Sequence, residues 1–300
     1  MRHGLESIPF ANLKELNVLS SRIEEKRLFE LSELSHIAAE QILEGKISLE
    51  TPYAFSDAVR FRMERERDAH TPKDYASVLE KSADLALLLD TVAFSAFLSK
   101  ALGGALSPFP KGRKAQDVRI AYIPSPVSEQ AYKAVSAYLR KSTVLYVGGA
   151  EEACASVLAS DADGLLLPIA RGGERIAAIE RLTERYKLYM SAIIPVYGTD
   201  GQEMLYAFFT AQPTFFESAG GECLELLIQA ESYEAAMETA SLLSVFGYDV
   251  SYIAFSPLDY GRVRARIALA GDGDESALWF FLSLCTGEFF VLGRYRYLLT

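Results

Sequence analysis

The chain lacks the residues that build metal, disulfide and polyanion sites. It has three cysteines and three histidines among 300 residues, and a formal net charge of −10. Cys154, Cys223 and Cys285 lie far apart in apolar surroundings, so their spacing indicates neither a zinc site nor a disulfide framework. No stretch concentrates lysine and arginine as nucleic-acid binding requires. We therefore expect no metal, no cofactor and no nucleic-acid partner.

Long apolar runs are missing as well. The first ten residues, MRHGLESIPF, have no apolar core of the kind found in signal peptides, and no later run is long enough to span a bilayer. Half of the residues are nevertheless apolar, which is enough for a sizeable core. These features predict a globular, cytoplasmic protein of two or three domains without a membrane partner.

The first part of the chain has the pattern of an all-helical domain. Apolar residues recur at three- and four-residue steps from Leu13 to Ile42, which predicts one long amphipathic helix closed by Gly45. Two further helices are expected over residues 55–67 and 72–102. Three helices alone make a thin core, so this domain, residues 1–106, should need a partner.

After a glycine- and proline-containing linker at 103–116, strands and helices alternate. Alternation predicts a mostly parallel sheet with helices on its faces, in a domain over residues 117–216. The expected strands are 119–123, 143–147, 164–167, 188–194 and 205–210, and the expected helices are 128–139, 151–160 and 174–186. From residue 217 to 300 the order becomes strand, helix, two strands, helix, strand, which is a ferredoxin-like βαββαβ module.

Two polar stretches follow strands of the α/β domain, where open sheets bind their ligands. One is Ser128-Glu129-Gln130, either a remnant pocket or an ordinary helix start with serine as cap, and the cap is favoured. The other is Arg171, within the strand exit Ala170-Arg171-Gly172, which offers no carboxylate or amide. Its glycines could hold an anion on backbone donors, although a tight turn is the commoner use.

The three domains in this order resemble the bifunctional chorismate mutase/prephenate dehydratase family of phenylalanine biosynthesis, over nearly the whole chain. The resemblance implies an all-α chorismate-mutase-like domain, a periplasmic-binding-like α/β dehydratase domain and an α+β ACT regulatory domain. It also implies prephenate, chorismate or an aromatic amino acid as ligand, and a homodimer formed through the helical and ACT domains.

The dehydratase signatures of that family are mostly replaced. Its Gly-x-x-Gly-Thr-x-Ser turn with Glu-x-Ala corresponds to PSPVSEQA at 124–131, where neither the glycines nor the threonine is present. Glu-Asn-Ser becomes Ala170-Arg171-Gly172, and Thr-Arg-Phe becomes Tyr206-Ala207-Phe208. The family's second subdomain would follow Pro195, where this chain has only a connection of about ten residues, typical of a loop. We therefore expect a truncated dehydratase domain without dehydratase activity.

The mutase-like and ACT-like parts keep only weak candidates for binding. Alignment puts Leu34 and Asn17 where two inward arginines of the mutase are expected, a loss of contacts worth about 1.5–3 kcal/mol each. The remaining mutase candidates are Lys46, Arg65 and Glu66, completed by Ser95 or Ser99. The charges around Arg65 also suit a solvated helix face. The ACT candidates are Glu234, Ala235, Ser256 and Pro257, with a glutamate where the family has a ligand-covering glycine.

Three hypotheses follow. The first is a homologue in aromatic amino-acid biosynthesis that lacks dehydratase activity and serves as a regulatory or scaffolding protein. The alternatives are a residual chorismate mutase and an amino-acid-binding ACT sensor. A second chain that supplies the missing half of the cleft also remains open.

Overall fold

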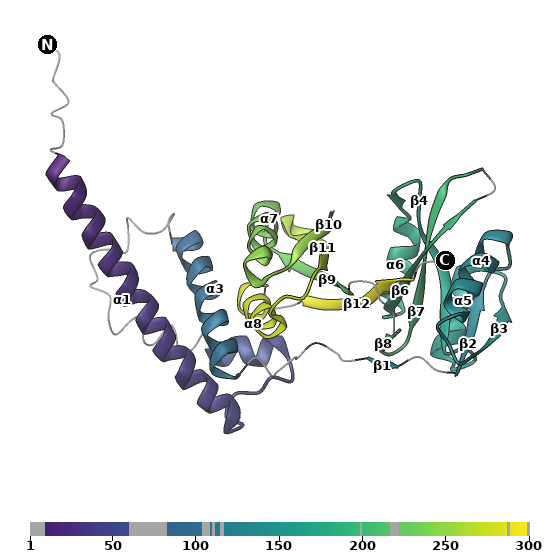
Figure 1. Cartoon of the computed structure of the whole chain (residues 1–300), viewed down its shortest axis with the longest axis horizontal. Coiled ribbons are helices and arrows are strands. Elements are labelled where there is room, and N and C mark those ends of the chain that lie inside the picture. Colours follow the sequence, from purple (N-terminus) through teal and green to yellow (C-terminus); the bar gives the residue numbers. More distant parts are fainter. Residues whose placement is uncertain are drawn as a thin grey trace, which may run out of the picture. The chain divides into compact units, whose positions relative to one another are not determined.

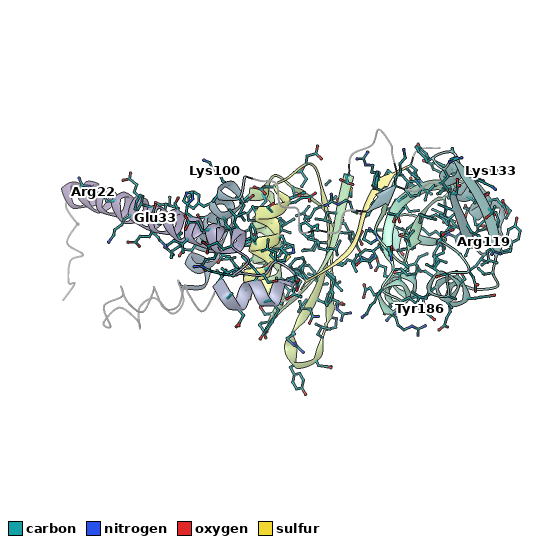
Figure 2. All side chains as sticks on the ribbon, turned by 90° about the horizontal axis from the view of Figure 1, so that it is seen from below. Arg22, Glu33, Lys100, Arg119, Lys133 and Tyr186 are labelled. Atoms are coloured by element: carbon teal, nitrogen blue, oxygen red, sulfur yellow. The ribbon has the colours of Figure 1, made fainter. Side chains whose placement is uncertain are left out.

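The computed structural model describes residues 10–59, 83–103, 109, 112–114, 117–198, 200–216, 222–286 and 289–298. The chain divides into two compact units (Figure 1). A helical unit combines Met1–Leu106 with Ser276–Gly287, and a mixed α/β unit combines Ser107–Glu275 with Glu288–Thr300. Exposed charged side chains such as Arg119, Lys133 and Lys100 point away from the two cores (Figure 2).

The helical unit contains the long helix that the periodicity predicts. Helix α1 (Phe10–Leu43) ends just before Gly45, whose φ of +71° suits glycine. Residues 52–59 are helical, and α3 (Ala83–Ala101) packs against α1, with an ion pair between Arg27 and Asp90. The remaining parts of the two other predicted helices, residues 60–67 and 72–82, lie outside the described residues.

The core of the helical unit includes a helix from the end of the chain. Helix α8 (Glu275–Thr286) is buried at each residue from Ser276 to Leu284. The Phe55 ring lies 5.3 Å from the Trp279 ring and 5.1 Å from the Phe280 ring. A helix that is apolar on all sides belongs inside a core. The chain therefore supplies from its own C-terminal region part of the core that its N-terminal helices lack.

The α/β unit begins with three parallel strands in the order β3-β2-β4. These strands and the helices between them are β2 (Asp117–Tyr122), α4 (Pro126–Ser136), β3 (Lys141–Tyr146), α5 (Ala150–Leu158) and β4 (Gly164–Arg171). Strands β6 (Tyr189–Tyr197) and β7 (Glu203–Thr210) follow as an antiparallel hairpin, and β7 is antiparallel to β4. The prediction of a mostly parallel sheet is wrong at these strands, because a short turn can join only antiparallel neighbours.

Two predicted boundaries in this region are wrong. Strand β4 continues past Leu167 to Arg171, because its last residues pair with β7. The helix predicted from Glu174 begins only at Ala177, as α6 (Ala177–Arg185), because β5 (Glu174–Arg175) folds back onto β4. Gly172 and Gly173 make that reversal with φ of +57° and +86°.

The βαββαβ module has the predicted element order. Its elements are β9 (Glu222–Ala230), α7 (Tyr233–Leu242) with the 3-10 helix η2 (Leu243–Phe246), β10 (Asp249–Pro257), β11 (Val263–Ala270), α8 and β12 (Phe289–Tyr297). A second 3-10 turn, η3 (Asp259–Gly261), joins β10 to β11. The strands pair antiparallel in the order β10-β11-β9-β12, and α7 packs on β9 and β11.

Strand β12 (yellow in Figure 1) joins this module to the other strands of the α/β unit. It pairs antiparallel with β9 and parallel with β6, so one ten-stranded sheet runs β10-β11-β9-β12-β6-β7-β4-β2-β3, with β5 beside β4. At the joint Gly293 lies opposite Met190. A Cβ atom at Gly293 would stand 2.3 Å from the Met190 carbonyl oxygen and 2.7 Å from its Cβ. The joint therefore requires glycine.

The substitution Gly293→Ala should weaken the joint. Because the clash is with backbone, we expect the free energy of unfolding to fall by about 1–3 kcal/mol, the usual cost of overpacking. Urea denaturation measures the change. Gly149→Ala is the control, since a Cβ there meets nothing within 4 Å. Equal effects of the two substitutions would contradict the close packing of β12 on β6.

Candidate functional site

The carboxyl ends of β2 and β4 flank the place where an open α/β sheet usually binds its ligand. The chain passes from β2 outward to β3 and then returns across β2 to β4, so the winding direction reverses between β2 and β4. A crevice at such a reversal is the common ligand site of these folds. The loop after β2 leads directly into α4, which carries the predicted residues Ser128, Glu129 and Gln130.

The serines at the start of α4 bond to each other and to the backbone. Ser125 is the cap, and its Oγ accepts from the Ser128 amide at 3.1 Å. Ser128 Oγ accepts from the Ser125 amide at 2.8 Å and donates to the Ile123 carbonyl oxygen at 2.7 Å. Ser128 is only 2% exposed. The cap interpretation therefore describes this stretch, with Ser125 as the cap residue in place of Ser128.

Glu129 accepts hydrogen bonds from two tyrosine hydroxyls. Its Oε1 accepts from the Tyr122 hydroxyl at 2.9 Å and from the Tyr146 hydroxyl at 3.4 Å. The Tyr122 ring also stacks on Tyr132, with ring centroids 5.4 Å apart. Burial, and then the hydrogen bond to Glu129, raise the pKa of Tyr122 above its usual value. The neighbouring Gln130 is exposed.

Tyr206 packs on the α4 side of the sheet. It lies on β7 opposite Pro168 of β4, is 5% exposed, and shares a hydrogen bond with the Ser125 side chain. Burial raises the pKa of Tyr206, and the bond to Ser125 opposes that shift. Its side chain thus lies beside the start of α4. Only the family signature pointed to this position in the sequence, because a strand tyrosine by itself indicates sheet core.

Arg171 lies apart from the α4 residues. At the end of β4 its Nη2 donates to Asp200 Oδ2 at 3.0 Å and its Nε to Gln202 Oε1 at 3.1 Å. Both partners belong to the turn between β6 and β7. The Gln202 amide and then the Arg171 guanidinium lower the pKa of Asp200. Arg171 is exposed and holds the hairpin turn to the end of β4.

The mutase candidates are not brought together among the described residues. Lys46 is exposed after α1 and pairs with Glu44 at 2.6 Å. Arg65 and Glu66 lie outside the described residues. Ser95 and Ser99 are buried in α3, and Ser95 Oγ finds no hydrogen-bond partner within the described part of the chain.

The ACT candidates lie at element ends. Glu234 is exposed in the first turn of α7, and the Ala235 amide donates to the Ser232 cap at 3.1 Å. Ser256 and Pro257 are exposed at the end of β10. Within the described residues, the nearest ring contact between the two elements is made by their neighbours Tyr233 and Phe255, whose ring centroids lie 4.6 Å apart.

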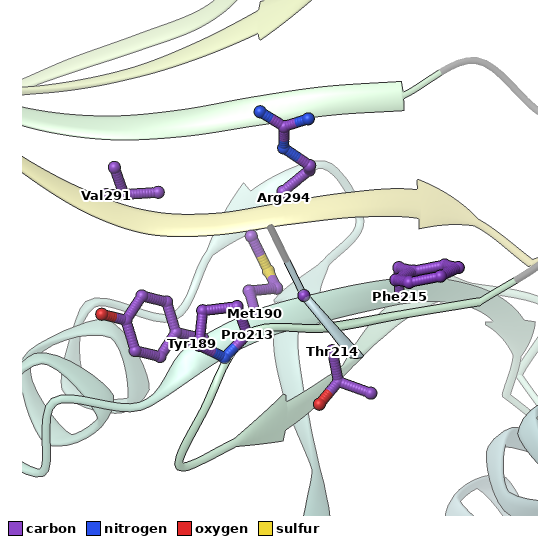
Figure 3. A pocket seen from close by; sticks show the side chains of 8 residues that line it. Tyr189, Met190, Pro213, Thr214, Phe215, Val291 and Arg294 are labelled. Atoms are coloured by element: carbon purple, nitrogen blue, oxygen red, sulfur yellow. The ribbon is translucent and has the colours of Figure 1, made fainter. Parts of the chain in front are cut away.

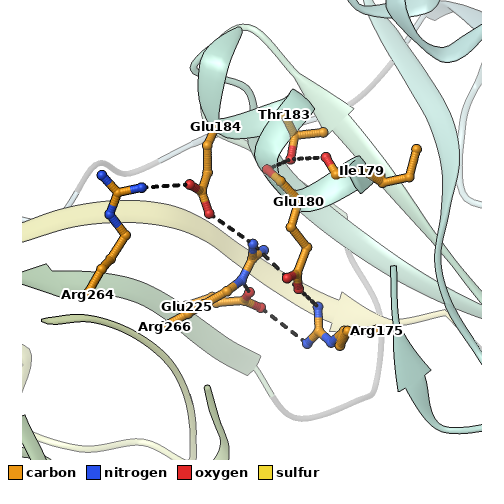
Figure 4. Close-up of polar contacts among 8 residues, drawn as sticks. All are labelled: Arg175, Ile179, Glu180, Thr183, Glu184, Glu225, Arg264 and Arg266. Carbon is orange, nitrogen blue, oxygen red and sulfur yellow. Dashed lines mark hydrogen bonds and ion pairs between the residues drawn. The ribbon is translucent and has the colours of Figure 1, made fainter. Parts of the chain in front are cut away.

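A cluster that sequence reasoning missed lies where α6 faces the βαββαβ module (Figure 4). We call its six side chains the charged seam: Arg175, Glu180 and Glu184 from β5 and α6, and Glu225, Arg264 and Arg266 from β9 and β11. Glu225 is fully buried and pairs with Arg266, whose own side chain is 8% exposed. The cluster thus contains three positive and three negative side chains, with both signs on each side of the contact. No local pattern could show this, because the partners are far apart in sequence.

The charged seam also includes an aromatic contact. The Arg175 guanidinium lies 4.5 Å from the centre of the Tyr252 ring, a cation–π arrangement. Burial raises the pKa of Glu184, while Arg266 and Arg264 oppose that shift. Desolvation therefore outweighs attraction at this carboxylate.

A small hollow lies near the joint of β12 and β6 (Figure 3). Gly112 and strand β8 (Thr214–Phe215) form one side of it, next to the parallel pairing of β8 with β1 (Arg113–Lys114). Its lining includes Tyr189, Met190 and Val291, and it has room for about one water molecule. That is too little space for a metabolite. Among the described residues no group of histidine, cysteine and acidic side chains could hold a metal ion, and no described helix could cross a membrane.

Comparison with known proteins shows a shared fold. No protein-family model and no curated protein matches the chain. The prephenate dehydratase of Streptococcus mutans matches with a TM-score of 0.50 and 17% identity, over 60% of this chain and 98% of that one. The prephenate dehydratase of Arthrobacter aurescens, in complex with L-Phe, matches with a TM-score of 0.48 and 13% identity, over 60% and 90%. GqqA, described as a novel type of quorum-quenching acylase, matches at 0.47 and 16%, over 59% and 94%.

The mixed α/β sheet therefore resembles the prephenate dehydratase fold. At identities this low the likeness extends to the fold alone, so no activity passes to this chain from it. What the site can do has to come from its own side chains.

The two tyrosines on Glu129 provide a matched pair of substitutions. Tyr122→Phe removes a buried hydroxyl and should lower the free energy of unfolding by about 1–2 kcal/mol. Tyr146→Phe removes an exposed hydroxyl from the same carboxylate oxygen and should cost less than about 0.5 kcal/mol. Chemical denaturation of both variants makes the comparison. Equal losses would mean that the Tyr122 bond is not part of a buried site.

Stability should fall in alkali. The folded-state pKa values of Tyr122 and Tyr206 lie above the usual value of 10.0, so the folded protein holds these protons more tightly than the unfolded chain does. The stabilisation is complete below pH 10 and is lost as the pH rises above it. Tyrosinate absorbance and circular dichroism, followed together, should show part of the ionisation coinciding with unfolding. Complete ionisation of a still-folded protein near pH 10 would contradict the burial of these rings.

Proposed function

We propose that this chain is a prephenate-dehydratase-like protein of aromatic amino-acid biosynthesis that lacks dehydratase activity and serves as a regulatory or scaffolding homologue. The observation that carries the proposal is that the polar side chains at the ends of β2 and β4 bond to one another. Tyr206 of β7 is 5% exposed and bonds to Ser125 at the start of α4.

The polar groups around the crevice are engaged with one another. Dehydration with decarboxylation needs donors positioned at the substrate carboxylate and at the departing hydroxyl. Ser128 bonds to the cap residue Ser125, and Glu129 accepts from two tyrosines. Arg171 is held by the hairpin turn. These hydrogen bonds and ion pairs support a protein that keeps the fold but does not catalyse the dehydration.

The β6–β7 hairpin supports the same conclusion. Tyr197 of β6 pairs directly with Glu203 of β7, so the chain turns back where the resemblance would place the family's second subdomain. A cleft with two walls would then require a wall from another chain. The homodimer predicted from the resemblance belongs to this proposal, as does the ACT-like nature of the βαββαβ module.

An amino-acid sensor is the second candidate. The βαββαβ topology favours it, because that module has the strand order of ferredoxin-like domains. Glu234 at the start of α7 is exposed and negative, which disfavours an amino-acid carboxylate at that helix end. A residual mutase gains no support from Lys46, which pairs with its neighbour Glu44.

Ligand binding and turnover test the proposal on the same preparation. We expect no conversion of prephenate or chorismate at enzyme-like rates, because Ser128, Glu129 and Arg171 are bonded to other side chains of the protein. Thermal-shift measurements with prephenate, chorismate and the aromatic amino acids then separate scaffold from sensor. A ligand present at 100 times its Kd would stabilise the fold by about 2.7 kcal/mol. Prephenate turnover by the wild-type protein would overturn the proposal, and a shift with phenylalanine alone would select the sensor.

A further inference from the structure

Strand β3 is an open edge of the ten-stranded sheet (Figure 1). It pairs in parallel with β2 over its whole length, and with no other strand that the structure describes. The Val147 amide, just after β3, donates to the Tyr122 carbonyl oxygen at 3.2 Å. Because backbone groups of successive residues point to opposite sides of a strand, those of Ser142, Val144 and Tyr146 point away from β2. Such a row of N–H and C=O groups can pair with another strand.

The opposite edge of the sheet, β10, is protected against pairing. It begins with the exposed Asp249, ends with Pro257, and has a register shift between Val250 and Tyr252. Charges, proline and bulges are the usual features that keep an edge strand from pairing. Strand β3 keeps one register with β2, contains no proline and carries a single charge, Lys141 at its first residue. It is therefore the edge that can accept another strand.

Apolar side chains flank this edge on both faces of the sheet. On the α4 face, Val144 packs against the apolar cluster beneath α4, and the Tyr146 side chain is 59% exposed. On the α5 face, Leu145 is only partly buried against the cluster that includes α5. A strand added at this edge would cover all three side chains. Apolar burial would then add to the backbone hydrogen bonds.

The sequence of β3 fits a second copy of itself. In an antiparallel pair with a two-fold axis at Val144, Val144 faces the partner's Val144, and Ser142 faces the partner's Tyr146. These are the residues whose backbone groups point outward, so each facing pair exchanges both of its N–H···O hydrogen bonds. An axis at Thr143 would place Tyr146 opposite Arg140, which lies outside the strand. The axis at Val144 therefore uses the whole outward row.

The same register brings opposite charges together. Lys141 is exposed, lies on the α5 face like Leu145, and falls opposite the partner's Val147. In each chain the Gly148 amide donates to the exposed Glu152 carboxylate of α5 at 2.7 Å, which places that carboxylate beside the end of β3. The one positive charge of the strand thus meets a negative charge of the second copy, and symmetry makes the contact twice.

We propose that β3 pairs antiparallel with β3 of a second copy of this chain, about a two-fold axis at Val144. The two sheets then form one continuous sheet, with both α4 helices on one face and both α5 helices on the other. The contact uses neither the helical unit nor the βαββαβ module, and it is independent of the proposed function. An edge contact is at the lower end of specific interfaces in size, so we expect a dissociation constant of about 1–100 μM.

Hydrogen exchange of the full-length wild type, resolved to single amides and followed over protein concentration, tests the contact. The outward amides of Ser142, Val144 and Tyr146 should exchange about tenfold or more slowly in the dimer, because pairing protects them. The amides of Thr143 and Leu145 face β2 in monomer and dimer alike and should not change. Sedimentation velocity on the same samples gives the fraction of dimer. A dimer whose protection appears at β10 or α1 instead of β3 would overturn the proposal.

Charge reversal provides the matched comparison. Lys141→Glu places a negative charge beside the partner's Glu152 and should weaken the dimer about tenfold or more. Arg181→Glu makes the same change in net charge at an exposed position of α6, which packs on β4, and should have less than about a twofold effect. Glu152→Lys should weaken the dimer as Lys141→Glu does. An equimolar mixture of these two variants should dimerise like the wild type, because each contact again joins opposite charges.

The remaining outcomes would overturn the proposal. A wild type that stays monomeric at about 500 μM leaves the edge of β3 to a strand of a different protein. If Lys141→Glu and Arg181→Glu weaken the dimer equally, net charge and not the β3 edge governs association. If the mixture of the two charge-reversal variants stays monomeric, Lys141 and the partner's Glu152 do not meet.

Discussion

Strand β12 is the element on which the arrangement of the α/β unit depends. It is the only strand paired with both β9 and β6 among the described residues, so the two halves of the sheet meet through it. That pairing places α6 opposite β9 and β11, and the charged seam forms as a result (Figure 4). Gly293 makes the pairing possible, since any side chain there would meet the backbone of Met190. A single position without a Cβ thus sets the geometry of contacts made by residues as far away in the sequence as Arg175.

The side-chain bonds at the start of α4 follow from the need to satisfy backbone polar groups. A helix start exposes several amide donors, which must be bonded by a cap, by water or by a ligand. Ser125 and Ser128 bond two of these amides here. The start of α4 is therefore satisfied by side chains of the chain itself.

The local sequence pattern was sufficient to predict the long helices and strands. It was insufficient to predict the pairing and the contacts between them. The periodicity from Leu13 to Ile42 predicted α1, and the order of strands and helices predicted the βαββαβ topology. The end of β4 and the start of α6 could not be predicted, because both depend on pairing with β7 and β5. Ser128 and Glu129 were singled out by their place after a strand, and they lie at the start of α4. The charged seam could not be found, because its partners come from three separate segments and each looks like a solvated charge.

The spacing of those partners explains why charges suit this contact better than apolar side chains. Two residues along a strand advance about 6.6 Å, and four residues along a helix advance about 6.0 Å. Arg264 and Arg266 on β11 therefore match Glu184 and Glu180 on α6, and the observed pairs follow that match. A slip of one residue in β11 would turn both arginines to the opposite face of the sheet. Apolar side chains would tolerate a small shift of α6 along the strand, whereas opposite charges at matched spacing do not. The seam thus specifies one register between α6 and the sheet, even though its net contribution to stability is small.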